Sequence, residues 1–164
     1  NDAGIAIAEH VSGSEEAFNN KMNDIANKIG AVDTHFTNAH GLHSEDHYTT
    51  AYDLYLIFSK LLEYEKAKEI IAMPKVTVKY QDAEDNQKES VFYNTNKYLK
   101  GEVTSPAGIT VEGGKTGTTN AAGYCLELLV QDEQGNQYIA MVLKTDGTNS
   151  LYQQMNHLIS KIES

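Results

Sequence analysis

The sequence predicts an α+β fold in which helices come first, antiparallel strands follow, and a last helix closes the chain. Three observations support this prediction. Apolar residues recur at helical spacing before Pro74, they alternate with polar residues after it, and a helical pattern returns over 149–164. Helices and strands that are segregated along the chain are typical of α+β domains. We therefore expect a mainly helical part over 1–73, and a mainly sheet part with the last helix over 74–164.

Two helices are predicted over 1–30. Small apolar residues over 3–11 are compatible with a buried helix. Ser12 with Glu15 then resembles a capping box that begins a second helix, and Gly30 is typical of a helix stop. Within this second helix, apolar side chains recur at helical spacing at Phe18, Met22, Ile25, Ala26 and Ile29.

A further pair of helices is predicted before Pro74. Thr50 with Asp53 makes another capping box, which opens a helix that we expect to reach about Tyr64. The apolar face of this helix would comprise Leu54, Ile57, Phe58, Leu61 and Leu62. The segment EYEKAKEIIAM follows as a short helix, which ends before Pro74 because a residue that precedes proline disfavours helical geometry.

The remainder of the chain predicts strands and one amphipathic helix. KVTVKY and SVFY alternate around a polar turn and predict a hairpin. NTNKYLKGE is expected to form a loop with a short helix, and GITVEGGKTGTT a strand. GYCLELLVQ and YIAMVLKT predict a second hairpin through the turn DEQGN. The closing helix would bury Leu151, Met155, Leu158, Ile159 and Ile162.

The charge balance narrows the classes of partner. The chain has 13 basic and 23 acidic residues, for a net charge of −10, and every basic residue is a lysine. An acidic chain without arginine lacks the basic face that nucleic-acid binding needs, so we expect no nucleic acid as a partner. Any anion would be held by lysine, hydroxyl groups or backbone N–H groups. The single cysteine, Cys125, excludes an internal disulfide.

The stretch VEGGKTGTTNAAGYC, over 111–125, contains the candidate binding residues. Glycines in a strand mark places where a ligand or another backbone approaches closely, and a strand edge of this kind can pair with an extended peptide. Lys115 and the hydroxyl groups of Thr116, Thr118 and Thr119 could receive a carboxylate. On composition alone, a hairpin corner with a solvated lysine explains the same residues equally well.

A family resemblance favours the first interpretation. KTG on a strand is one of three motifs of the penicillin-binding proteins and serine β-lactamases, beside S-x-x-K and S-x-N. GKTGTTNAAGYCL, FTNAHGLHSEDHYTTAYDL and YNTNKYL each resemble segments of the D-alanyl-D-alanine carboxypeptidases, the low-molecular-weight penicillin-binding proteins. The opening NDAGIAIAEHVSGS is similar to the segment that begins at the asparagine of S-x-N, so the resemblance covers nearly the whole chain.

The resemblance implies a β-lactamase/transpeptidase-like fold and a serine-type peptidase. In that family a serine is acylated by the D-Ala-D-Ala end of a peptidoglycan stem peptide, and water hydrolyses the acyl-enzyme. Carried over by motif, Asn1 and Lys115 would be catalytic, and Lys115, Thr116, Gly117 and Thr118 would bind substrate. The implied partners are stem peptides and β-lactams, the location is the cell envelope outside the cytoplasmic membrane, and no cofactor is implied.

The chain departs from the family pattern in one respect. None of its serines has a lysine three residues on, and no S-x-N is complete, because its serine would precede Asn1. We therefore expect an incomplete domain, cut inside S-x-N, that is inactive alone and that self-associates through exposed sheet surface. Two alternatives remain: a serine β-lactamase, and a non-catalytic module that binds peptidoglycan peptides.

The segment HGLHSEDH suggests a second kind of site. Histidine and carboxylate side chains are common zinc ligands, and the segment gathers several of them. The spacing matches no compact zinc signature, and a polar loop that leads into the Thr50 cap explains it as well. We expect no metal at these residues, which are His40, His43, Glu45, Asp46 and His47.

Overall fold

The computed structural model describes residues 1–162 and confirms an α+β fold with a C-terminal helix. The helices are α1 (Asp2–Ser12), α2 (Glu15–Lys28), α3 (Ala51–Leu61), α4 (Glu65–Ala72) and α5 (Thr148–Ile159). The strands are β1 (Lys75–Gln81), β2 (Gln87–Tyr93), β3 (Thr110–Thr119), β4 (Gly123–Gln131) and β5 (Gln137–Thr145). Among the described helices, none combines the length and the apolar character needed to cross a membrane.

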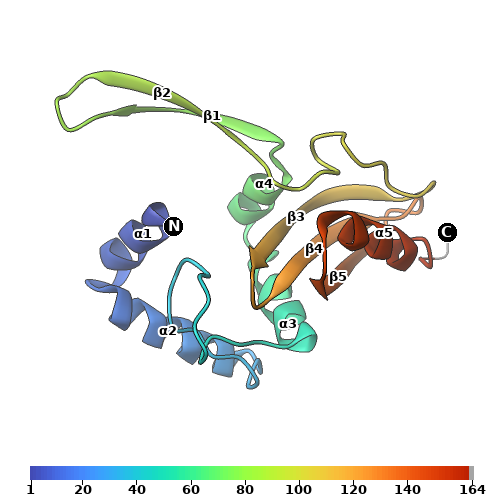
Figure 1. Ribbon diagram of the computed structural model, residues 1–164, viewed down its shortest axis with the longest axis horizontal. Coiled ribbons are helices and arrows are strands. Elements are labelled where there is room, and N and C mark those ends of the chain that lie inside the picture. Colours follow the sequence, from blue (N-terminus) through green and yellow to red (C-terminus); the bar gives the residue numbers. More distant parts are fainter. Residues whose placement is uncertain (163–164) are drawn as a thin grey trace.

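The strands form two separate antiparallel sheets. Strands β1 and β2 make a two-stranded hairpin, and β3, β4 and β5 make a three-stranded sheet in that order. Figure 1 shows the β1–β2 hairpin projecting away from the rest of the molecule, with α5 lying against the three-stranded sheet. Both predicted hairpins are therefore confirmed, but the first of them stands apart from the main sheet.

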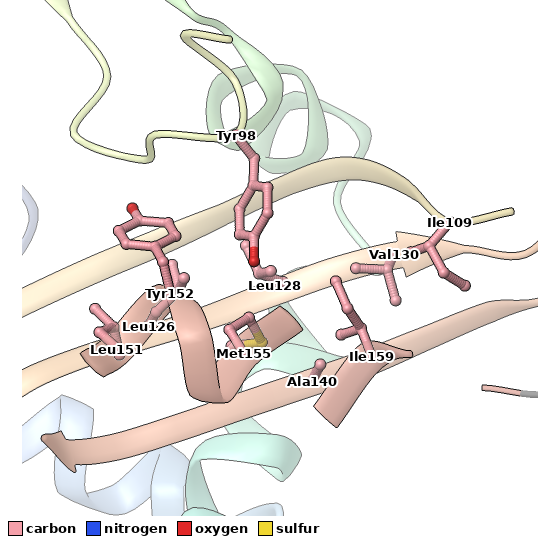
Figure 2. Close-up of a cluster of buried hydrophobic side chains, with 10 residues drawn as sticks. All are labelled: Tyr98, Ile109, Leu126, Leu128, Val130, Ala140, Leu151, Tyr152, Met155 and Ile159. Atoms are coloured by element: carbon pink, nitrogen blue, oxygen red, sulfur yellow. The ribbon is translucent and has the colours of Figure 1, made fainter. Parts of the chain in front are cut away.

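The main core lies between α5 and one face of the three-stranded sheet (Figure 2). Alternate residues of β4 point into it, because side chains alternate across a strand. The α5 side chains that meet them lie one helical turn apart, as the sequence predicted for Leu151, Met155 and Ile159. The prediction for Leu158 is wrong, because this side chain is 40% exposed, and Tyr152 is buried instead.

The opposite face of the sheet is covered in part by α4. A Cβ atom at Gly113 of β3 would lie 2.8 Å from Cγ1 of Ile71, so only glycine lets α4 approach the strand this closely. Gly113 is paired with Leu129 of β4, which is buried on this second face. Helix α5 thus packs on one face of the sheet, and α4 covers part of the other.

Helix ends differ from the prediction at some positions. The side chain that caps α2 belongs to Ser14, which accepts from the backbone N–H of Ala17 at 3.1 Å, and Ser12 is instead the last residue of α1. Thr50 caps α3 as predicted, by accepting from the N–H of Asp53 at 3.1 Å. Helix α3 ends at Leu61 and not near Tyr64, and NTNKYLKGE forms turns and no helix.

Two further predictions concern the positions at which α2 and the closing helix end. The predicted stop after α2 is confirmed at Gly30, which adopts the left-handed conformation with φ 89°. The closing helix begins at Thr148 and ends at Ile159, so it is shorter than the pattern suggested. Ile162 lies beyond it and packs on the core, and the remainder of the predicted helix, 163–164, lies outside the described residues.

Candidate active site

Strand β3 is an edge strand of the three-stranded sheet. It pairs with β4 on one side, and no strand among residues 1–162 pairs with its other side. In a strand, every second residue directs its N–H and C=O groups toward a given edge. The free edge of β3 can therefore accept an extended peptide as an added strand.

Different structural reasons explain the glycines at two positions of β3. A Cβ atom at Gly114 would lie 2.3 Å from the carbonyl oxygen of Glu127 and 3.3 Å from Nδ2 of Asn96, so packing forbids a side chain there. A Cβ atom at Gly117 would meet no atom within 4 Å. Internal packing therefore does not explain Gly117, and a glycine at this position keeps the strand accessible to an approaching ligand.

Lys115 lies on the sheet face that α4 partly covers. Its cross-strand partner is Glu127, two pairs along the register from the Gly113–Leu129 pair against α4. The Lys115 ammonium donates to the carbonyl oxygen of Thr116, and partial burial lowers the pKa of the lysine. The residue as a whole remains exposed, so its charge is accessible to a ligand at the strand edge.

Thr116 and Thr118 lie on the other face, toward α5. Their cross-strand partners are Leu126 and Tyr124, and the first of these belongs to the core beneath α5. The Thr116 hydroxyl shares a hydrogen bond with the hydroxyl of Thr95. The YNTNK segment, residues 93–97, thus lies directly beside the KTG strand, and the structure brings these two sequence motifs together.

A pocket of about 260 Å³ lies at this junction. Side chains from the YNTNK segment, from β3 and from the first turns of α5 line it, among them Thr95, Lys97, Thr116, Thr118, Thr148 and Tyr152. No motif in the sequence assigns a role to Lys97, although it lies in a segment that resembles the family. The lysine that lines the pocket together with the threonines is Lys97 rather than Lys115.

Asn1, the other predicted catalytic residue, immediately precedes α1. Its carbonyl oxygen accepts from the N–H of Gly4 at 2.9 Å, and its side chain does not cap the helix. Figure 1 shows α1 apart from β3, with its N-terminal end on the side nearer to the sheet. Within residues 1–162, the structure does not place Asn1 against Lys115.

The histidine-rich loop before α3 is held by local hydrogen bonds. Nδ1 of His35 lies 2.6 Å from the carbonyl oxygen of Asp46, and Nδ1 of His47 accepts from the N–H of Thr37 at 3.2 Å. Burial, followed by the neighbouring histidine charges, lowers the pKa of His47. Over 1–162, no three His, Cys, Asp or Glu residues are arranged to hold a metal ion.

Comparison with known proteins identifies relatives of the chain. A family model described as D-alanyl-D-alanine carboxypeptidase matches residues 1–147. The D-alanyl-D-alanine carboxypeptidase DacF of Bacillus subtilis is 41% identical over 128 residues, which are 77% of this chain and 30% of that protein. DacC of Escherichia coli is 34% identical over 149 residues, which are 89% of this chain and 34% of that protein. The chain thus spans about a third of the length of these curated relatives.

Solved structures agree with the sequence comparison. The D-alanyl-D-alanine carboxypeptidase DacD of Francisella tularensis superposes with a TM-score of 0.80 at 26% identity, covering 97% of this chain and 48% of that one. A variant of a Streptomyces DD-transpeptidase superposes with a TM-score of 0.87 at 23% identity, covering 97% and 61%. The second similarity supports the fold alone.

Proposed function

Because this chain belongs to the D-alanyl-D-alanine carboxypeptidase family, we propose that it forms part of a serine-type D-Ala-D-Ala carboxypeptidase that acts on peptidoglycan stem peptides. The observation that carries the proposal is the KTG sequence on an unpaired strand edge, with Lys115 and Gly117 accessible on β3. The family match spans this strand. A peptide that ends in D-Ala-D-Ala would lie along this edge as an added strand.

Each predicted site residue has a role in this proposal. Lys115 supplies positive potential to the terminal carboxylate of the substrate, and Thr116 and Thr118 offer hydroxyl groups to it. The backbone N–H of Thr118 contributes to the oxyanion hole, where loss of one donor costs about 3 kcal/mol of transition-state stabilisation. Gly117 keeps the strand accessible, and Asn1 contacts the substrate amide.

The reaction needs a nucleophile that these 164 residues do not provide in the family pattern, because no serine has a lysine three residues on. In the complete protein, a serine oxygen would attack the carbonyl carbon of the penultimate D-alanine. The peptide bond breaks, the terminal D-alanine leaves with a proton, and water then hydrolyses the serine ester. We propose that the 164-residue chain alone is inactive.

The same proposal gives location and ligands. Peptidoglycan lies outside the cytoplasmic membrane, so the complete protein would act in the cell envelope, in cell wall biogenesis. β-Lactams resemble the D-Ala-D-Ala end and would acylate the same serine, which is the behaviour of a penicillin-binding protein. Metal ions and cofactors have no part in this chemistry.

Intact mass measurement tests the proposal. The full-length gene product and the 164-residue chain are each incubated with a penicillin and weighed. We expect the full-length protein to gain one penicillin mass that persists, and the short chain to gain none. Rapid loss of the label with turnover of penicillin would favour a serine β-lactamase, and no labelling of either protein would favour a non-catalytic peptide-binding module.

We also propose that the isolated chain self-associates. Beside the free sheet edges, α1 and α2 expose apolar side chains, with Ile7 59%, Val11 49% and Ile25 45% exposed. Light scattering at increasing concentration measures the molar mass in solution. A mass that rises above 18.1 kDa agrees with the proposal, and a constant monomer mass contradicts it.

A further inference from the structure

The face of β3 that carries Thr116 and Thr118 lines a pocket that is also lined by a lysine, Lys97. The predicted carboxylate ligands on this side, Thr116 and Thr118, share the pocket with Thr95 and Lys97. Lys115 does not line this pocket, and the β3 register places it on the opposite face of the sheet. The hydroxyl groups and the nearest pocket cation thus come from two separate segments, β3 and the YNTNK turn.

The backbone of Lys97 is fixed at the pocket. Its N–H donates to the hydroxyl of Tyr152 at 2.9 Å, which ties the YNTNK segment to α5. The preceding Asn96 is fully buried, and its Oδ1 accepts from the N–H of Tyr98 at 3.1 Å. On the far side, the hydroxyl of Thr95 is hydrogen-bonded to that of Thr116. Substitution of the Lys97 side chain would leave all these contacts in place.

The Lys97 ammonium has no carboxylate partner within residues 1–162. It lies 5.8 Å from the centroid of the Tyr152 ring, a cation–π arrangement that positions the charge and does not neutralise it. The neighbouring carboxylate of Glu102 is already bound to Lys100, with 2.7 Å between nitrogen and oxygen. Lys97 feels the charge of Glu102 but forms no salt bridge within residues 1–162. A cation that lines one pocket with the threonine hydroxyls, and is not held in an ion pair there, matches the donor set that a small carboxylate requires.

We propose that Lys97 is a specificity-determining residue that binds the terminal carboxylate of a peptide lying along the free edge of β3. This inference rests on the proposed function. A ligand at a strand edge is within reach of side chains from both faces of the strand, so Lys97 would act from the α5 face and Lys115 from the other. Because the chain contains no arginine, a second lysine is the means by which it can add positive charge to this subsite.

Steady-state kinetics of the full-length protein test this proposal. The substrates are an acylated peptide that ends in D-Ala-D-Ala with a free carboxylate and the same peptide with a C-terminal amide. For Lys97→Ala we expect kcat/KM for the free acid to fall at least about tenfold, mainly through KM, and kcat/KM for the amide to stay unchanged. Lys97→Arg should restore most of the loss, because it restores the charge.

Lys79→Ala is the matched control, because it removes the same charge from the distant β1–β2 hairpin. It should leave kcat/KM unchanged for both substrates. Equal losses for the acid and the amide, or no loss for the acid, would overturn the role of Lys97. Penicillin labelling separates the two proposals. If all variants are acylated to completion while kcat/KM is unchanged, only the Lys97 proposal fails; if the wild-type protein is never acylated, the proposed function fails and this inference with it.

Discussion

The β1–β2 and β4–β5 hairpins have the same kind of turn but differ in how far their strands are buried. In the first, Oδ1 of Asp82 accepts from the N–H groups of Glu84 and Asn86 at 3.1 and 2.9 Å. In the second, Oδ1 of Asp132 accepts from those of Gln134 and Asn136 at 2.9 and 2.8 Å. Yet most of β1 and β2 is exposed, whereas β4 supplies the centre of the core. The two turns are alike, and the hairpins differ in that β4 is buried and pairs with β3, the strand of the candidate site.

The same contrast appears in two cross-strand pairs of lysine and glutamate. Lys79 faces Glu89 in the exposed hairpin, with 3.8 Å between their charged atoms. Lys115 faces Glu127 in the buried sheet, but one carboxyl oxygen of Glu127 has no hydrogen-bond partner within the described chain. Burial raises the pKa of Glu127 to about 8. Identical pairing therefore gives a solvated ion pair in one sheet and a carboxyl that resists ionisation in the other.

The largest expected difference comes from truncating one side chain in each hairpin. Leu128 of β4 is 0% exposed, so Leu128→Ala should cost about 2–5 kcal/mol of unfolding free energy through lost burial and a cavity. Val78 of β1 is 40% exposed, so Val78→Ala should cost less than about 1 kcal/mol. Urea denaturation measures both. Similar losses would mean that the β1–β2 hairpin packs against something in solution.

The second prediction concerns Glu127. Its folded pKa of about 8 lies above the ordinary 4.5, so the folded state binds the proton more tightly than the unfolded state. Stability should therefore fall as pH rises from about 4.5 to 8. Glu127→Gln should remove this dependence and should be more stable than wild type by about 1–3 kcal/mol above pH 8.

Glu89→Gln is the control for Glu127, because it makes the same change in the exposed pair. It should alter stability by less than about 0.5 kcal/mol at any pH. Urea midpoints at pH 5 and pH 9 compare the variants. A wild-type protein that is equally stable at both values while Glu127→Gln has no effect would show that Glu127 ionises normally in the fold.

The third prediction compares the two turn aspartates. The Asp132 carboxylate accepts two further hydrogen bonds, from the side-chain amide of Asn136 at 2.8 Å and from the Tyr138 hydroxyl at 3.1 Å. Together with the bonds from the turn N–H groups, they lower its pKa. Asp132→Ala should lower the melting temperature by about 5 °C, and Asp82→Ala by clearly less, because β1–β2 unfolding need not involve the core. Calorimetry of the two variants measures both melting temperatures, and equal decreases would contradict this prediction. The Asp132 contribution should be lost as pH falls through its lowered pKa, since only the ionised group accepts all these bonds.

Elements with a strong local pattern were predictable, and contacts between distant segments were not. Leu151, Met155 and Ile159 follow the helical period and are buried as predicted. Tyr152 was missed because its hydroxyl marks it as polar, yet that hydroxyl is satisfied by the backbone of Lys97. Ser12 was preferred to Ser14 as a cap because Glu15 lies three residues after it and completes a capping-box pattern. The left-handed Gly13, with φ 81°, ends α1 and moves the cap two residues on.

The candidate site shows the same division. The residues KTG were recognisable as a motif, and Lys115, Thr116, Gly117 and Thr118 were named from it; their roles remain predictions. Lys97 lies 18 residues before Lys115 in the chain, and only the turns that precede β3 bring it beside the threonines. No periodicity encodes such proximity, because it depends on how the YNTNK turn packs against α5.

The smallest expected effect lies at one residue of each turn. Both turns need a left-handed residue, which is Asp85 with φ 61° in the exposed hairpin and Gly135 with φ 86° in the buried one. Glycine adopts this conformation without the clash that a Cβ atom introduces, although it loses more entropy on folding. Asp85→Gly should therefore stabilise the β1–β2 hairpin by about 0.5 kcal/mol, and Gly135→Ala should destabilise the protein by about 1 kcal/mol. Because β1–β2 packs on little else, the gain from Asp85→Gly should appear as slower amide exchange within that hairpin and leave the melting temperature unchanged; a raised melting temperature would instead show that the exposed hairpin unfolds together with the core.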